Sequence, residues 1–164
     1  MKLSISNHFD CDPETLWSVF NSDAFNERLD AQSGVRRDVV ATRNEGGIEV
    51  TELRCVSKKE LPGFMAKALG SKSLEYMQTS RFDPKTNRLE WSVDPTVLSD
   101  RVTAKGTTVV TPQGDGCLRQ IEGEITVRLP LVGKKIEQKL MEEIGSSYER
   151  AAEIAAEMIA EQKA

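Results

Sequence analysis

Residues 116–140 read GCLRQIEGEITVRLPLVGKKIEQKL, and the hydrophobic period changes within this stretch. Up to Leu129, apolar and small residues alternate with polar ones, which is the period of a half-buried β-strand. After Pro130, apolar residues recur every three or four positions, which is the period of an amphipathic helix. The stretch therefore predicts a strand over 116–130 that leads into a helix from about residue 131.

The helical period continues to residue 162. At about 1.5 Å per residue such a helix is about 48 Å long, enough to cross a whole sheet. Small residues at 145–147, 151–152 and 155–156 reduce the bulk of its apolar face, which allows either close packing on a sheet or a space between helix and sheet. The apolar stripe consists of Ile136, Leu140, Ile144, Tyr148, Ala151, Ala155, Met158 and Ile159.

The part of the chain before this strand is dominated by a period of two. Residues 2–10 alternate, and from Val35 onward the same alternation is broken mainly by clusters of Gly, Pro, Asn and Asp that are typical of hairpin turns. Successive strands joined by hairpins form an antiparallel sheet. The strands that we expect are 2–10, 35–44, 47–57, 73–83, 88–95, 101–112 and 116–130.

Two helix starts lie between the first and second of these strands. Asp12 followed by Pro13 provides an N-cap and a first-turn proline, and Ser22 provides a second N-cap ten residues later. No repeat or linker divides the chain, so residues 1–164 are predicted to form one domain. The fold class is α+β, with two short helices after the first strand and a curved seven-stranded antiparallel sheet wrapped around a long C-terminal helix.

Charge and histidine content exclude several classes of function. The chain has 22 Lys and Arg against 26 Asp and Glu, a formal net charge of −4. Nucleic-acid-binding domains normally carry a strongly basic face, so we expect no nucleic-acid partner. The single histidine, His8, excludes metal sites built from several histidines and leaves most His-based catalytic arrangements incomplete. The sequence implies no metal, no cofactor and no catalytic residue.

The cysteines and the N-terminus bear on the cellular compartment. Cys11, Cys55 and Cys117 are widely spaced and odd in number, so they predict neither a disulfide framework nor a zinc site. The N-terminus turns polar at once, and no apolar stretch approaches the ~20 residues that span a bilayer. We therefore expect a cytoplasmic protein with free thiols.

Three motifs resemble a known superfamily. Residues 9–17 (FDCDPETLW) resemble the first strand and N-capped helix of the START-like superfamily, also called SRPBCC or birch-pollen-allergen-like, which has the helix-grip fold. Residues 61–64 (LPGF) and 129–137 (LPLVGKKIE) resemble, more specifically, an uncharacterised bacterial family of unknown function within it. The layout is also similar to PRELI/MSF-type phosphatidic-acid transfer domains. The resemblance implies an apolar ligand cavity between the sheet and the long helix.

Several side chains are candidates to line such a cavity. If the alternation of the last strand faces the helix, Arg119 points inward and needs a carboxylate or an anionic ligand head group; alternatively it reaches solvent at the open end of the sheet. Tyr76 and Gln78 share the parity of Leu74 and suit polar anchors. Trp91 is a further lining candidate, or a core residue, and the helix would contribute Leu140, Ile144 and Tyr148.

The segment 58–72 interrupts the strands with a short apolar stretch that contains Phe64, Met65 and Leu69. It is flanked by lysines, namely Lys58, Lys59, Lys67 and Lys72. Such a segment suits a lid over the cavity and, less strongly, transient contact with an anionic membrane surface. The alternative is a small helix that caps the sheet edge.

These observations favour binding over catalysis. The leading hypothesis is non-catalytic binding, transport or sensing of an apolar, lipid-like small molecule between the sheet and the C-terminal helix. One alternative is a protein-binding or co-chaperone-like module with a closed core. Another is a cyclase- or dehydratase-type enzyme, such as the superfamily includes, that uses Arg119, Tyr76 or Tyr148 in the cavity.

Overall fold

The computed structural model describes residues 1–97 and 99–164, which form seven strands and four helices. The strands are β1 (Lys2–Phe9), β2 (Val35–Glu45), β3 (Ile48–Ser57), β4 (Glu75–Asp83), β5 (Arg88–Pro95), β6 (Val102–Gln113) and β7 (Gly116–Val127). The helices are α1 (Pro13–Phe20), α2 (Asp23–Gln32), α3 (Gly63–Leu69) and α4 (Gly133–Lys163). The predicted α+β helix-grip arrangement is confirmed.

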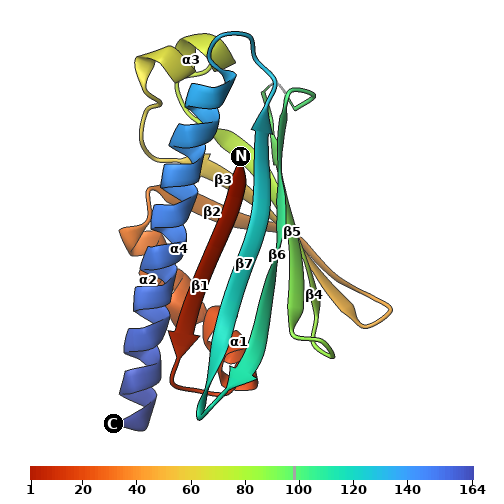
Figure 1. The fold of residues 1–164 in the computed structure, drawn as a ribbon, viewed down its shortest axis with the longest axis vertical. Helices are drawn as coiled ribbons and strands as arrows, with labels where there is room; N and C mark the ends of the chain where they lie inside the picture. Colours follow the sequence, from red (N-terminus) through yellow and green to blue (C-terminus); the bar gives the residue numbers. More distant parts are fainter. Residues whose placement is uncertain (98) are drawn as a thin grey trace.

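All seven strands belong to one antiparallel sheet in the order β1-β7-β6-β5-β4-β3-β2. The sheet twists strongly, so that β2 and β3 run at a steep angle to β1 and β7 (Figure 1). Helix α4 lies along β1 and β7, with α1 and α2 beside its C-terminal half and α3 near its N-terminal end (Figure 1). The helices and the sheet therefore enclose one interior.

The register of the strands decides which side chains face this interior. Residues directly opposite each other in an antiparallel pair lie on the same face of the sheet. On β1 the inward residues are Leu3, Ile5, Asn7 and Phe9, and their partners on β7 are Gly123, Ile121, Arg119 and Cys117. The alternation that predicted β7 is thus the alternation between the interior and solvent.

The two short helices begin where the sequence predicted. The Asp12 side chain accepts a hydrogen bond from the Thr15 backbone N–H at 2.8 Å, and the Ser22 hydroxyl accepts one from the Phe25 N–H at 3.2 Å. Each cap satisfies a backbone donor that the helix itself leaves unpaired. The helices bury Leu16, Val19, Phe25 and Leu29 against Ile154, Met158 and Ile159 of α4.

The junction between β7 and α4 is longer than predicted. Strand β7 ends at Val127 rather than at residue 130, and α4 begins at Gly133 rather than at residue 131. The Val127 N–H donates to Glu137 Oε1 of α4 at 2.8 Å, outside the strand ladder. Leu131 adopts a left-handed φ of 68°, which neither a strand nor a right-handed helix can contain. Strand and helix are therefore separated by a tight loop.

Trp91 of β5 determines the shape of the sheet centre. It lies opposite Gly106 of β6, which in turn pairs with Gly123 of β7. A Cβ atom at Gly106 would lie 2.5 Å from Trp91 Cζ2, and one at Gly123 would lie 2.8 Å from the same indole. Both positions need glycine because the indole ring rests directly on the two strands.

Candidate ligand-binding site

A pocket lies beneath α3, between that helix, the N-terminal half of α4 and the ends of β4–β6. It is narrow and nearly filled by side chains, because the free space inside it is about 20 Å³, roughly that of a single water molecule. Helix α3 covers the pocket with Met65 and Leu69, which are both buried. The helix ends at Gly70, which has the left-handed φ of 68° that is common after a helix C-terminus. The lining is mainly apolar: Leu61, Leu69, Ser71, Ser73, Leu74, Glu75, Pro95, Val97, Val102, Ile136 and Leu140.

An apolar interior continues from this pocket along α4. The cluster under α3 and the cluster around Trp91 share Val93, Met141 and Ile144. The second cluster also contains Ile121 and reaches Tyr148, about three turns further along α4 than Ile136. The interior therefore extends from the pocket to the middle of the sheet without a polar interruption between the clusters.

The inner face of β4 is only partly covered. Gln78 pairs with Leu53 of β3 and Val93 of β5, so it faces the interior. Gln78, Tyr76 and Ser80 are nevertheless half-buried rather than buried. Helix α4 packs on β7 and β1, so it leaves the neighbouring part of the inner face accessible.

Arg119 lies at the far end of this interior and is 4% exposed. Its Nη2 donates to Asn7 Oδ1 at 2.7 Å and to the Tyr148 backbone carbonyl at 3.3 Å. The guanidinium carbon lies 5.5 Å from the Phe9 ring centroid, 4.9 Å from that of Phe20 and 5.8 Å from that of Tyr148. Of the two orientations considered from the sequence, the structure has the inward one.

The charge of Arg119 is not neutralised by the protein. Among the described residues, no carboxylate forms an ion pair with it, and its buried Nε has no hydrogen-bond acceptor. Burial away from water lowers the pKa of the guanidinium to about 10, so it is still charged at neutral pH. The interior therefore contains a cation held by a neutral amide, a carbonyl and three aromatic rings.

Both tyrosines are desolvated. Burial raises the pKa of Tyr148 to about 12, partly offset by the nearby Arg119 cation. Burial also raises the pKa of Tyr76, and the neighbouring Cys55 thiol on the facing strand adds to this rise. Both phenols are neutral at physiological pH and are suited to hydrogen bonding, not to acting as anions.

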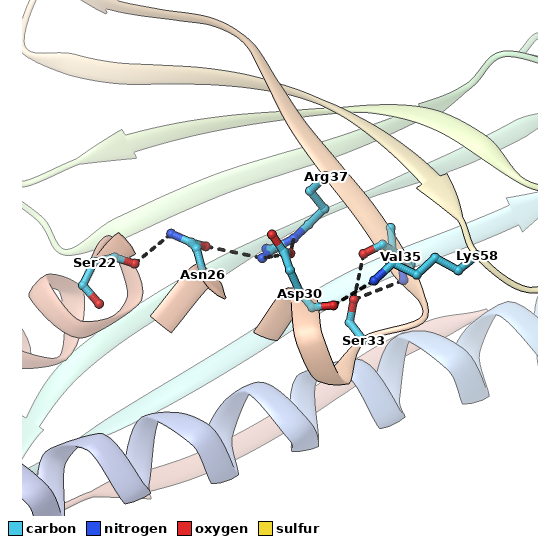
Figure 2. A network of polar contacts seen from close by, with 7 residues as sticks. All are labelled: Ser22, Asn26, Asp30, Ser33, Val35, Arg37 and Lys58. Carbon is cyan, nitrogen blue, oxygen red and sulfur yellow. Dashed lines mark hydrogen bonds and ion pairs between the residues drawn. The ribbon is translucent and has the colours of Figure 1, made fainter. Parts of the chain in front are cut away.

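A polar network closes the side of the interior between α2 and β2 (Figure 2). Arg37 of β2 donates from Nε and Nη2 to Asp30 Oδ1 of α2, at 2.9 and 2.7 Å. Lys58 Nζ donates to the Asp30 backbone carbonyl at 2.8 Å, and the Ser33 hydroxyl bridges to Val35. Because Arg37 pairs in register with Cys55, next to Tyr76, the network lies at the border of the partly covered inner face.

The predicted site residues fall into separate groups. Met65, Leu69 and Leu140 lie in or around the pocket under α3, while Phe64 packs at its edge with Lys135 Nζ 4.2 Å from its ring centroid. The cluster around Trp91 contains Ile144 and Tyr148, and Arg119 lies beside Tyr148 at the far end of the interior. Tyr76 and Gln78 stand on β4, on the same face.

Sequence reasoning did not identify the residues that surround the Arg119 guanidinium, namely Asn7, Phe9 and Phe20. One signal was available: Asn7 is the polar member of the otherwise apolar stripe Leu3, Ile5 and Phe9. Whether Asn7 lies opposite Arg119 depends on the pairing of β1 with β7, and local periodicity does not specify that pairing.

A second hollow lies on the outer face of the sheet. It is wide and open, with about 540 Å³ of space, and it lies behind Trp91, Gly106 and Gly123. Charged residues of both signs surround it, including Lys2, Arg81, Lys105, Glu90, Glu122 and Glu124. It is larger than the pocket under α3, but it is a mixed-charge surface without an enclosed apolar lining.

Two other kinds of feature are not found in the described part of the chain. No three His, Cys, Asp or Glu side chains there are grouped so as to hold a metal ion. Nor is any helix within residues 1–97 and 99–164 both long and apolar enough to cross a membrane.

Residues 4–159 match the family described as "Protein of unknown function (DUF2505)". The chain belongs to this family. No curated protein is similar enough in sequence to match it.

Several solved structures are similar in fold to this DUF2505 protein. The protein TTHA0849 from Thermus thermophilus has a TM-score of 0.70 at 16% identity, covering 100% of both chains. A START superfamily protein from Mycobacterium smegmatis has a TM-score of 0.58 at 16% identity, covering 93% of this chain and 97% of its own. A norcoclaurine synthase from Thalictrum flavum has a TM-score of 0.65 at 17% identity, covering 100% and 96%. The predicted START-like fold is confirmed, and identities this low carry the fold alone.

Proposed function

We propose that this DUF2505 protein binds an apolar, lipid-like small molecule between α3, α4 and the inner face of the sheet. The observation that carries the proposal is the apolar pocket under α3, continued by the shared Val93, Met141 and Ile144 toward the centre of the interior. The START-like fold is known for binding hydrophobic molecules, which supports the same function. Free thiols at Cys11, Cys55 and Cys117 suit a reducing compartment such as the cytoplasm.

Within the single domain 1–164, we assign segment 58–72 the role of a lid. Helix α3 is short, and it is joined to the sheet by loops on both sides. Its contact with α4 includes the cation–π pair of Phe64 with Lys135, which is worth only about 0.5–1 kcal/mol at exposed sites. Ligand would enter the pocket when α3 lifts from Ile136 and Leu140.

The same end of the molecule is suited to transient contact with an anionic membrane. Leu131 is fully exposed in the β7–α4 loop, which lies beside α3 (Figure 1). Lys67 of α3 is exposed, and so are Lys134 and Lys135 in the first turn of α4. Lys58 differs, because its ammonium group is turned toward α2. An apolar side chain among lysines matches the interfacial binding mode, in which burial and attraction to anionic lipid add together.

The test of ligand binding uses the full chain. Native mass spectrometry, followed by extraction of bound lipids, would identify a co-purified ligand. A fatty-acid and phospholipid panel in thermal-shift assays would show added binding. Leu140→Trp, which fills the pocket, should abolish the shift, whereas Gln138→Trp on the exposed side of α4 should retain it.

The outcome also separates the alternatives. A clean apo mass with no thermal shift across the panel would refute the carrier function and favour a protein-binding module. If a substrate is turned over, substitutions of Arg119, Tyr76 and Tyr148 should abolish turnover. Unchanged turnover would exclude these residues from an enzymatic role.

A further inference from the structure

We propose that the ligand carries a carboxylate, that Arg119 binds this carboxylate in the interior, and that the apolar tail of the ligand extends toward α3. The proposal deepens the proposed function and rests on it. It names the ligand class as a long-chain carboxylic acid or a similar single-chain amphiphile.

The first argument is the uncompensated charge. Arg119 keeps only 4% of its surface exposed, and a buried charge without a counter-ion is expensive in free energy. Its partners, the Asn7 amide and the Tyr148 carbonyl, accept hydrogen bonds but carry no net charge. The three aromatic rings offer cation–π attraction and likewise leave the net charge in place. An anion bound here would supply the missing counter-charge.

The second argument is the unused hydrogen-bonding capacity. A guanidinium has five N–H donors in a planar fork. Both hydrogen bonds formed with described residues come from Nη2, and the buried Nε lacks an acceptor. A carboxylate presents two oxygen atoms with the spacing of adjacent guanidinium N–H groups, which makes it the matching partner.

The third argument is the distance between the two ends of the interior. Tyr148, whose carbonyl contacts Arg119, follows the pocket residues Leu140 and Ile136 by eight and twelve positions on α4. At about 1.5 Å per residue this separates the cation from the pocket by roughly 12–18 Å. Between them, the α4 side chains that pack into the interior are Met141 and Ile144, which are apolar. Along α4 the buried cation is followed by apolar side chains and then by the apolar pocket under α3. A ligand with an anionic head and an extended acyl tail matches this order.

The experiment compares ligands that differ only in the head group. Hexadecanoic acid, hexadecan-1-ol and methyl hexadecanoate are titrated into the full chain at neutral pH by calorimetry. The acid should bind at least about tenfold more tightly than the alcohol or the ester, because a hydrogen bond to a charged group contributes about 1.5–3 kcal/mol. In Arg119→Met the preference for the acid should disappear, and Arg119→Lys should retain part of it.

The ligand comparison on the unaltered protein remains decisive even if Arg119→Met does not fold. Equal affinity for the acid, the alcohol and the ester would overturn the carboxylate site and leave the proposed apolar binding intact. Binding of none of the three, with no co-purified lipid, would overturn both. A lysophosphatidate with the same acyl chain serves as the competing anion, and tighter binding of this phosphate monoester than of the acid would also overturn the assignment to a carboxylate.

Discussion

Arg119 of β7 and Asn7 of β1 lie directly opposite each other in the sheet, and Nη2 of the arginine donates to Oδ1 of the asparagine at 2.7 Å. Both side chains point into the interior, so the hydrogen bond holds the buried guanidinium against the edge strand. Because the amide is neutral, it fixes the position of the cation without neutralising it. Among the described residues, the charge of Arg119 is therefore left without a counter-ion.

Asn7→Asp should replace this hydrogen bond by an internal ion pair between the new carboxylate and Arg119. The new carboxylate would occupy the position from which the amide oxygen now accepts the 2.7 Å hydrogen bond. It would compete with a carboxylate ligand, and we expect the affinity for hexadecanoic acid to fall by about tenfold or more while that for hexadecan-1-ol is unchanged. Ser6→Asp, on the outer face of the same strand, is the matched control. Unchanged affinity for the acid in Asn7→Asp would contradict the proposed head-group site.

The tyrosines predict a loss of stability at alkaline pH. The pKa of Tyr148 is raised to about 12 from an ordinary value of 10.0, so the unfolded state loses the proton first as the pH rises. Stability is fully present below pH 10 and falls between pH 10 and 12, by at most about 1.4 kcal/mol per pH unit for this group. Urea unfolding across this range measures the slope. Tyr148→Phe should reduce the slope and leave the part that comes from Tyr76, and an identical slope in the variant would show that Tyr148 does not contribute.

Substitution by alanine should have opposite effects at two glycines, Gly106 of β6 and Gly145 of α4. At Gly106 an added methyl group would meet the Trp91 indole and the backbone of β7, so Gly106→Ala should destabilise by about 1–3 kcal/mol or more. At Gly145 of α4 nothing lies within 4 Å of the added carbon, so Gly145→Ala should stabilise by about 0.5–1 kcal/mol through helix propensity. Chemical denaturation of both variants tests the pair. A stabilising Gly106→Ala would show that the indole does not rest on the strands as described.

Much of this fold is predictable from local patterns. The alternation of β7 and the caps at Asp12 and Ser22 are encoded within a few residues of each element, and the structure reproduces them. The position of α4 over β1 and β7 is a tertiary property, and it decides whether Arg119 is buried or solvated. For that reason the sequence alone leaves both orientations of Arg119 open.

The pocket lining is harder to predict than the fold. Leu61 and Val97 lie in connecting segments outside the helices and strands, where no hydrophobic period marks an inward direction. The apolar pattern places Leu131 in the helix, whereas its left-handed backbone ends that pattern. Loop conformation depends on contacts with distant elements, such as the Val127 hydrogen bond to Glu137, rather than on local period.

One substitution at Leu131 should preserve the stability of the fold and weaken the proposed membrane contact. Its φ of 68° costs roughly 1–2 kcal/mol for a residue that carries a Cβ atom, and its side chain is fully exposed, so the fold gains nothing from it. Asparagine tolerates this backbone conformation, and we expect Leu131→Asn to leave stability unchanged or to raise it by up to about 1 kcal/mol. The same variant should lose binding to vesicles of phosphatidylserine and phosphatidylcholine in co-sedimentation. Val39→Asn, which removes an exposed apolar side chain from β2, should keep it. If Leu131→Asn binds these vesicles as well as the unaltered protein does, the β7–α4 loop is not a membrane contact.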